Sequence, residues 1–445
     1  MAMNRFGAVV LAVMASVPGL AGTWSKEQIP GGQGGNVWSL VAPSEARVFG
    51  TGTLKDQQGN DKMYWVRAPD GKSWKIEEIK TPSPGEMLLL TDLVCVSDQK
   101  CFTVGMGVNQ QTMGFFNRFG VSADGGDTWL WPKPLPLPES RIVVLDEANL
   151  WFVAGNTNCL KTTDGGVTFK PFAARVGQTL FTAIQDGSFL DTLRGWLVNG
   201  DADKDEKTGA VTIHPKGAVL KTTDGGKTFV ALLQDRPEVY ERVKFVSDKV
   251  GFLTGYNDAG PFLRRTDDGG ATWTDMALPP VEGGAATAIV NWHVFNDKAA
   301  LILAVRKVND QTSFFSIWRM KDGKTLADEP IPSHDGYMIG LACASQKRCW
   351  AGGKNMEVLA YEGTDEDVVA SAEPVGGPDV AFAEPLADAV IQVEDGTAAG
   401  DGVAADTAKT GGSGGCNAGP SGSFVAFGLV LLALWRPFSR GVPCD

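Results

Sequence analysis

The chain has 445 residues, of which 43% are hydrophobic, so it is long enough to bury a sizeable core. Its 40 basic and 52 acidic residues give a net charge of −12, and the lack of a basic excess argues against a nucleic-acid-binding protein. The 55 glycines and 13 tryptophans favour many short strands joined by turns.

The N-terminus has the features of a secretory signal peptide. Arg5 supplies a charged start, residues 6–17 are almost wholly apolar, and residues 18–21 offer a small-residue cleavage site. We therefore expect residues 1–22 to be an export signal that is processed next to Ala21. The alternative is a buried first helix or strand.

The first strand of the mature chain is expected at Thr23–Ile29. Its Thr-Trp, short strand and Pro resemble the stretch that begins at Thr272-Trp273. Because the last repeat of the chain offers only three strands, we predict that residues 23–29 form its outermost strand, paired with Glu357–Glu362, with Trp24 in the place of Trp273. A leader without structure over residues 23–36 is the alternative.

Seven similar units follow within residues 23–363. Unit one (37–79) and unit six carry degenerate patterns at Asp70–Trp74 and Asp322–Thr325, units two to five carry complete ones, and unit seven covers 336–363. Such repeats of short strands predict an all-β fold, a seven-bladed β-propeller of four-stranded blades. Six or eight blades are the alternatives, because the degenerate patterns are the weakest evidence.

The complete pattern is Ser/Thr-x-Asp-x-Gly-x-Thr-Trp/Phe. An Asp before two glycines is turn chemistry: its carboxylate accepts nearby backbone N–H groups, and glycine supplies the positive φ of a tight hairpin. The Thr starts a strand, and the aromatic residue buries against a neighbouring sheet. The four copies are Ser122, Asp124, Gly126, Thr128 and Trp129; Thr162, Asp164, Gly166, Thr168 and Phe169; Thr222, Asp224, Gly226, Thr228 and Phe229; and Thr266, Asp268, Gly270, Thr272 and Trp273.

We interpret these Asp residues as structural. A carboxylate whose oxygens are occupied by its own backbone is a poor proton carrier. Carboxylates that lie 40 or more residues apart also form no obvious metal cage. Acid/base or metal-binding roles are the alternative.

Two pairs of cysteines share one spacing. Cys95 and Cys101, like Cys343 and Cys349, flank a Ser-containing turn between two expected strands. Cysteines that face each other across such a hairpin can be bridged, and disulfides fit an exported protein, so we predict both bonds. A metal site is the alternative, but no His lies near either pair. The roles of Cys159 and Cys444 stay open.

The C-terminal part changes composition sharply. Residues 362–408 contain twelve acidic and no basic residues, so residues 364–415 are expected to be an extended, self-repelling linker. Residues 416–445 contain Cys416, a short apolar run over 424–435 that predicts a hydrophobic helix, and two arginines. This run is short for a membrane span of about 20 residues.

The sequence contains none of the common catalytic or cofactor-binding motifs. The histidines His214, His293 and His334 lie far apart, which gives no metal-ligand spacing. Three Gly-Lys-Ser/Thr triplets lack the leading glycine of a phosphate loop, and no nucleophile elbow is present. We therefore assign no catalytic, cofactor-binding or metal-binding residues and no cofactor, and we expect a protein that is not an enzyme.

The eight-residue pattern resembles the Asp-box, or BNR, repeat. Within that group the chain is similar to photosystem II stability/assembly factor-like propellers, and sialidases and sortilin-type receptors carry the same box. The tail from Cys416 resembles a myxobacterial sorting domain, although it has neither a Cys-Gly-Cys cluster nor a dense Arg tail. The box implies the fold and leaves the activity open, because unrelated proteins use it.

These resemblances and segments imply an exported scaffold at the cell surface or outer envelope, anchored by or processed at its C-terminus. We expect it to bind a surface protein or glycan, with sorting machinery acting on the tail and membrane contact only through the C-terminal helix. One alternative is a sialidase-like glycoside hydrolase, which would need a Tyr nucleophile and an Arg cluster; the entry motif of that family is matched only by Arg67-Ala68-Pro69. The other is an assembly factor for membrane protein complexes.

Overall fold

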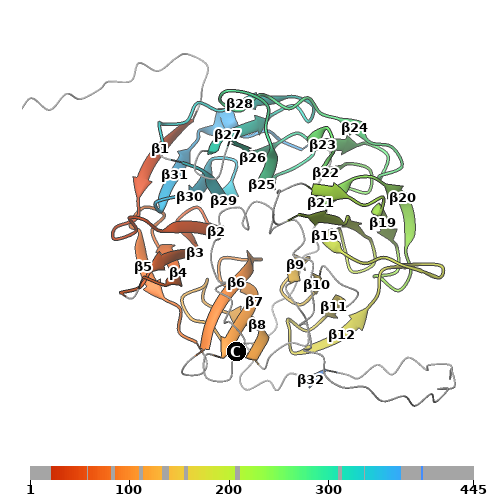
Figure 1. The fold of residues 1–445 in the computed structure, drawn as a ribbon, viewed down its shortest axis with the longest axis horizontal. Helices are drawn as coiled ribbons and strands as arrows, with labels where there is room; N and C mark the ends of the chain where they lie inside the picture. The colour runs from red at the N-terminus through yellow and green to blue at the C-terminus, as the bar shows by residue number, and fades with distance from the viewer. Residues whose placement is uncertain are drawn as a thin grey trace, which may run out of the picture.

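A computed structural model describes residues 22–371 and 392–393, apart from residues 58, 82–85, 110–113, 133–139, 155–158, 206–210, 309–312 and 335. Seven antiparallel sheets stand around a common axis, with β2, β6, β9, β15, β21, β25 and β29 innermost (Figure 1). The prediction of an all-β, seven-bladed propeller is confirmed.

The first three blades follow one another from residue 36. Blade 1 contains β2 (Asn36–Ser44), β3 (Arg47–Lys55), β4 (Asp61–Ala68) and β5 (Lys75–Glu78). Blade 2 contains β6 (Glu86–Cys95), β7 (Cys101–Asn109) and β8 (Gly114–Ser122). Blade 3 contains β9 (Ser140–Val144), β10 (Leu150–Ala154), β11 (Cys159–Thr162) and β12 (Thr168–Phe172).

The remaining blades complete the ring. Blade 4 contains β15 (Ile184–Phe189), β16 (Gly195–Asn199), β19 (Gly217–Thr222) and β20 (Val230–Arg236). Blade 5 contains β21 (Val239–Phe245), β22 (Gly251–Asn257), β23 (Gly260–Thr266) and β24 (Thr274–Asp275). Blade 6 contains β25 (Ala288–Val294), β26 (Ala300–Lys307), β27 (Ser313–Met320) and β28 (Leu326–Asp328). Blade 7 contains β29 (Met338–Ser345), β30 (Arg348–Gly353), β31 (Glu357–Glu362) and β1 (Thr23–Gln28).

Three small elements lie outside this scheme. Two of them are short hairpins in connections between strands. The hairpin of β13 (Arg175–Val176) and β14 (Thr179–Leu180) lies between β12 and β15, and that of β17 (Ala202–Lys204) and β18 (Val211–Ile213) lies between β16 and β19. The two-residue strand β32 (Gln392–Val393) lies parallel to β12. In residues 22–371, outside the gaps given above, no helix is long and apolar enough to cross a membrane.

Blade 2 departs from the expected four strands. Its third strand, β8, is joined on the outer side by a single bridge, between Val121 and Leu130. Pro132 follows two residues later and has no N–H group with which to extend the ladder. The described part of this blade is therefore three-stranded.

The ring closes as predicted. Strand β1 pairs antiparallel with β31, from Thr23 opposite Glu362 to Gln28 opposite Glu357. Trp24 lies opposite Tyr361 and is buried, with the two ring centroids 5.2 Å apart. The N-terminal strand therefore fills the outermost place of the last blade, and the edge of β31 is covered.

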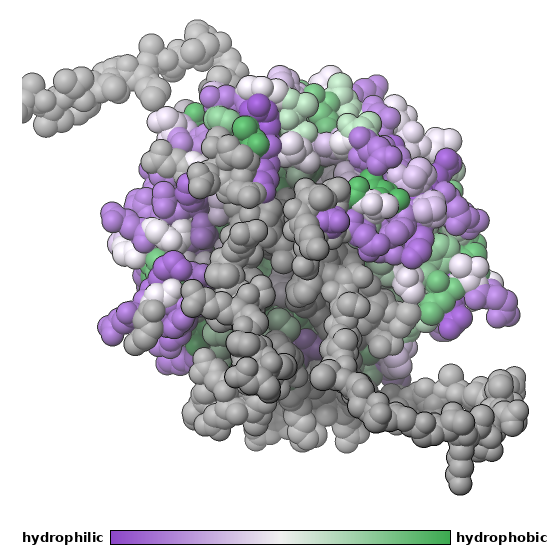
Figure 2. Space-filling model, viewed as in Figure 1, coloured by the Kyte–Doolittle hydropathy of each residue, from purple (hydrophilic) through white to green (hydrophobic). Residues whose placement is uncertain are grey.

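Aromatic residues pack the blades against one another. Trp151 on β10 stacks on Phe189 of the next blade, and Trp196 on β16 stacks in the same way on Phe245, each with ring centroids 3.7 Å apart. Side chains alternate between the two faces of each sheet, so each blade packs one face against the preceding blade and the other face against the next. On the view in Figure 2 the outer surface is mostly hydrophilic, with hydrophobic residues in small separate groups.

Residues 364–371, which the composition assigned to the linker, pack on blades 6 and 7. Thr364 caps a short 3₁₀ helix, η1 (Asp365–Asp367), and the Asp367 carboxylate lies 3.1 Å from Lys321 Nζ. The Val369 carbonyl accepts hydrogen bonds from Asn296 Nδ2 (2.7 Å) and Gln346 Nε2 (2.9 Å). Lysines of the propeller and the helix cap offset the charge repulsion that composition alone suggested, so the propeller extends to Ser371.

Candidate functional site

The four complete Asp boxes adopt one geometry. In the copy at Asp224, Oδ1 accepts the backbone N–H of Thr228 (2.9 Å) and Oδ2 accepts its hydroxyl (2.6 Å). The Thr222 hydroxyl accepts the N–H of Gly226 (2.9 Å), whose φ of 88° belongs to the left-handed region that favours glycine. The corresponding bonds are present at Asp124, Asp164 and Asp268.

The degenerate boxes keep the turn with one residue fewer. Asp70 accepts the N–H and the hydroxyl of Ser73, and Asp322 those of Thr325, three residues ahead instead of four. The hydroxyl bonds, followed by the backbone bonds, lower the pKa of Asp70, Asp224, Asp268 and Asp322 to about 2. These carboxylates are therefore ionised hydrogen-bond acceptors at neutral pH and have no proton to donate.

The box carbonyl groups also join neighbouring blades. Trp196 Nε1 donates to the Gly269 carbonyl (3.2 Å), and Trp350 Nε1 donates to the Gly71 carbonyl (3.3 Å). Arg265 of blade 5 reaches the Gly323 carbonyl (3.1 Å). Each of these boxes is thus an acceptor for a residue of the preceding blade.

We predict that Asp164→Ala and Asp224→Ala each lower the free energy of unfolding by about 1–3 kcal/mol, because the donors of the turn lose their acceptor. Chemical denaturation with each variant measures this cost. Lys227→Ala, at an exposed position of the same turn, is the matched control and is expected to change little. Variants that keep full stability but lose ligand binding would contradict the structural role.

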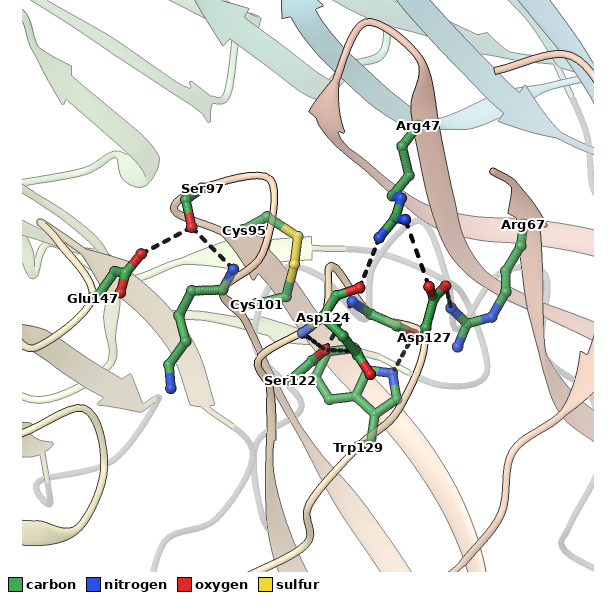
Figure 3. The surroundings of a disulfide bond; sticks show 12 residues. Arg47, Arg67, Cys95, Ser97, Cys101, Ser122, Asp124, Asp127, Trp129 and Glu147 are labelled. Carbon is green, nitrogen blue, oxygen red and sulfur yellow. Dashed lines mark hydrogen bonds and ion pairs between the residues drawn. A yellow bond between two sulfur atoms is a disulfide. The ribbon is translucent and has the colours of Figure 1, made fainter. Parts of the chain in front are cut away.

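Both predicted disulfides are present. Cys95 and Cys101 are paired in register on β6 and β7, and Cys343 and Cys349 on β29 and β30, with Cα atoms 4.0 Å apart in each case. Figure 3 shows the first bond beside Ser97, whose hydroxyl lies 2.9 Å from the Glu147 carboxylate of blade 3. On the other side Arg47 of blade 1 donates to the Asp124 carbonyl (2.7 Å). Cys159 is a buried thiol outside both bonds.

Reducing either disulfide is expected to cost about 2 kcal/mol, since each closes a short loop. Alkylation of the purified protein before and after reduction, followed by peptide mass analysis, tests the pairing. Cys159 serves as the internal control, because a buried thiol is alkylated only after unfolding. Free thiols at all four positions in exported protein would contradict the prediction.

The other residues singled out from the sequence are scattered. His214 Nε2 lies 2.9 Å from Asp203 on the β17–β18 hairpin, and the His334 ring packs on Phe315. Ala21 and Cys416 lie outside the described residues. Among the described residues, no group of three His, Cys, Asp or Glu side chains is placed to hold a metal ion.

A Tyr–Glu–Arg group near the start of β21 has the composition that sialidase chemistry would need. Tyr240 donates to Glu238 (2.6 Å), which also accepts two hydrogen bonds from Arg264 (both 2.8 Å). Tyr240 is fully buried, and burial together with the Glu238 bond raises its pKa far above the ordinary value. In this arrangement the Tyr240 hydroxyl is a buried hydrogen-bond donor to Glu238.

The ring axis carries a second set of charged residues, which the sequence analysis missed. We call it the axial cluster: Asp92 on β6, Arg141 on β9, Asp186 on β15, Glu241, Arg242 and Lys244 on β21, and His293 on β25. Arg141 Nη1 lies 3.9 Å from Asp186 Oδ1, and Arg242 Nη2 donates to the Val290 carbonyl of blade 6 (3.0 Å). These residues come from five consecutive innermost strands, so only the closed ring brings them together (Figure 1).

Two carboxylates of the axial cluster are held by the next blade. Asp92 accepts the N–H of Ile142 (2.8 Å), and Asp186 accepts the N–H of Val243 (3.1 Å). Burial raises the pKa of Asp92, although Arg141 and these backbone bonds act against the change. Asp92 and Asp186 therefore join neighbouring blades.

The remaining members have shifted pKa values of several kinds. Burial raises the pKa of Glu241 to about 7, against the opposing effect of Arg242 and Arg141. Burial, and then the Arg141 charge, lowers the pKa of Arg242 to about 10; burial and Lys244 lower that of His293 to about 4. At neutral pH His293 of the axial cluster is therefore neutral, and Glu241 is near its titration midpoint.

Glu238 and Glu241 lie three residues apart and are predicted to affect stability in opposite ways. Burial opposes ionisation of Glu238, but the Arg264 and Tyr240 bonds outweigh it and lower its pKa to about 2. Its stabilisation is complete above pH 4.5 and is lost as the pH falls towards 2. Glu241 binds its proton more tightly when folded, so its contribution becomes unfavourable as the pH rises from 4.5 to 7.

We therefore expect Glu241→Gln to raise the melting temperature at pH 8 and to leave it unchanged at pH 4. Glu238→Gln should lower it at pH 7, with a smaller effect near pH 3. Thermal melts of both variants across this pH range provide the test. A pH-independent effect of Glu241→Gln would show that its carboxyl group has an ordinary pKa.

The turn between the first and second strands, which the cysteine spacing predicted in two blades, recurs in further blades. Asp146, Asp191 and Asn296 each accept two backbone N–H groups of their own turn, at 2.7 to 2.9 Å. Ser97, Ser247 and Ser345 take the same place with one or two weaker bonds. A Ser, Asp or Asn shortly before each second strand was the available signal.

No protein-family model matches the chain, and no curated protein matches it. Among solved structures it is similar to YCF48 from Cyanidioschyzon merolae, with 13% identity over 78% of this chain and 100% of that chain and a TM-score of 0.51. It is also similar to a YCF48 chain described as bound to D1 peptide, with 12% identity, 77% and 97% coverage and a TM-score of 0.50. The GH74 enzyme of Niastella koreensis has 14% identity, 75% and 53% coverage and a TM-score of 0.49. At such identities the likeness to the YCF48 structures shows the seven-bladed fold alone.

Proposed function

We propose that this protein is a non-catalytic binding scaffold that holds a segment of another protein, or a glycan, at the ring axis. The observation that carries the proposal is the axial cluster, in which five innermost strands place charged side chains around one axis. Lys244 is exposed, and Glu241 and Arg242 are only partly buried, so a ligand can reach them. Charged groups that are surrounded by protein and still accessible favour a ligand of complementary charge.

The tyrosines support binding over glycoside hydrolysis. Burial raises the pKa of Tyr337 to about 12 and those of Tyr240, Tyr256 and Tyr361 further still. A retaining sialidase would instead need an accessible Tyr activated by a carboxylate base, with arginines to hold the substrate. The described residues do not combine these features around one tyrosine.

Export and display at the cell surface are part of the proposal. Its support is the signal-like start of the chain and the apolar, arginine-flanked end, both of which lie outside the described residues. A YCF48 propeller has been observed with a bound peptide. A protein segment is therefore a ligand that this fold can hold, and we favour it over a glycan. A role in assembling membrane complexes is compatible with such a site.

The test uses the full chain with a photo-cross-linking amino acid in place of Lys244, exposed to the outer-surface proteins of the producing cell. Position 227 on the rim is the matched control. A protein that cross-links at 244 and not at 227, with no turnover of fluorogenic glycosides, is the expected result. Glycoside turnover that is abolished by Arg242→Ala would instead identify a hydrolase.

A further inference from the structure

Glu241 has an exceptional position among the innermost strands. In six of these strands one residue within the strand interrupts the pairing register with the second strand, a β-bulge; β2 and β29 have a further irregularity near their ends. The interrupting residues are Trp38, Thr91, Gln185, Glu241, Val290 and Ile339. Among these described bulges, Glu241 is the one with an ionisable side chain.

In several blades the residue that follows the bulge bonds to the next blade. Glu241 is a bulge residue and makes no such bond itself. Asp186 reaches the N–H of Val243, Arg242 reaches the Val290 carbonyl, and Asn291 Nδ2 reaches the Ile339 carbonyl (3.1 Å). In the described part of the chain the Glu241 carboxylate takes part in no hydrogen bond and no ion pair within 4 Å. The structure of the ring therefore does not require this carboxylate, and its protonation state can change without loss of a contact.

The groups that face Glu241 come from several strands. Arg242 follows it on β21 and Arg141 approaches from β9, and both act on its charge. Glu241 in turn acts on Tyr256 of β22, as does Asp201. Asp186 acts on both Arg242 and Lys244, and Asp92 acts on Arg242. His293 faces Lys244 and is neutral near pH 7.

We propose that Glu241 is the specificity-determining residue of the axial site, which binds an acidic segment of a partner protein when Glu241 is protonated and binds it more weakly when Glu241 is ionised. This inference rests on the proposed function and adds the ligand class. The axial cluster contains three basic side chains, those of Arg141, Arg242 and Lys244, which attract an anionic ligand. Ionisation of Glu241 adds a negative charge that Arg242 and Arg141 feel directly, so the site then attracts an anion less strongly.

The direction of the pH dependence follows from linkage. A ligand carboxylate close to Glu241 favours the protonated form, so binding raises the pKa of Glu241 and affinity increases as the pH falls. If binding raises that pKa by one unit, the affinity changes about tenfold between the two forms.

The test measures binding of a fluorescein-labelled hexaglutamate peptide to the full chain by anisotropy at pH 6 and pH 8, at constant low salt. Wild-type protein is expected to bind about fivefold more tightly at pH 6 than at pH 8, because both pH values lie within about one unit of the free or bound pKa of Glu241. Glu241→Gln is expected to bind at both pH values with the pH 6 affinity of wild type. Lys244→Glu should weaken binding at least tenfold at pH 6, whereas Lys227→Glu, on the rim, should not.

Equal affinity of wild-type protein at both pH values, or a pH dependence retained by Glu241→Gln, would overturn the inference while leaving the scaffold function in place. Absence of hexaglutamate binding, or preferential binding of an oligogalacturonate, would also overturn it, because the ligand would not be an acidic protein segment. Failure of the scaffold function is seen separately, as absence of a specific cross-link at position 244. Circular dichroism at each pH confirms that the variants are folded.

Discussion

Deletion of residues 23–30 is expected to abolish cooperative unfolding of the propeller. These residues supply all of β1, whose six positions pair with β31, as well as the buried side chains of Trp24 and Ile29. Without β1 the edge of β31 becomes an open template for pairing with other chains. The loss is comparable with the whole stability of a domain, about 5–15 kcal/mol, so we expect aggregated or partly folded protein.

The measurement is thermal unfolding followed by circular dichroism, with size-exclusion chromatography to detect aggregates. Trp24→Ala, which keeps the strand, is expected to cost about 3–5 kcal/mol through loss of buried aromatic volume. Val230→Ala, at an exposed strand position, is the matched control and should be neutral. A deletion variant that melts at the temperature of the parent would show that the ring is held closed by other contacts.

Glu329→Ala is expected to lower the free energy of unfolding by about 3–5 kcal/mol, because it leaves a buried arginine without its counter-charge. Glu329 accepts hydrogen bonds from Arg319 Nε (2.8 Å) and from Trp24 Nε1 (3.1 Å). The Arg319 and Glu329 side chains are only 5% and 10% exposed. The Arg319 guanidinium also lies over the Tyr361 ring, 4.3 Å from its centroid. One carboxylate therefore supports both blade 6 and the closing strand.

Urea denaturation separates this prediction from a general charge effect. Glu329→Gln retains an acceptor for one donor and is expected to cost less than the Ala variant. Glu78→Ala removes an ion pair with Lys62 whose side chains are 64% and 40% exposed, and it should cost less than about 1 kcal/mol. Equal effects of Glu329→Ala and Glu78→Ala would show that the buried pair contributes no more than a surface pair.

The position of Trp24 could be predicted from the sequence, but its hydrogen-bond partner could not. The repeat predicted its strand and its place in blade 7. However, Trp273 donates its indole N–H to the Gly270 carbonyl of its own box (3.0 Å), whereas blade 7 has no box and Trp24 donates to Glu329 instead. The local pattern identifies the position of the aromatic residue, and a strand more than 300 residues away supplies its partner.

For residues 364–371 the prediction from sequence was wrong. They belong to the stretch 362–408, whose twelve acidic and no basic residues predict an extended linker when only neighbours in sequence are considered. Asp367 is nevertheless 2% exposed, because Lys321 from the end of β27 lies beside it. Composition reports the mean charge of a segment, whereas its folding depends on which counter-charges the rest of the chain brings to it.

The Asp-box turns and the two disulfide hairpins could be predicted from the sequence because they are made within a few residues, and the recurrence of these turns predicted the blades. Each of these depends on hydrogen bonds or covalent bonds between residues at fixed short separations, so the residue types specify them directly. The axial cluster, the three described strands of blade 2 and the docking of residues 364–371 depend instead on contacts between distant parts of the chain. The axial cluster joins residues from Asp92 to His293, and its contacts exist only because ring closure places five innermost strands around one axis.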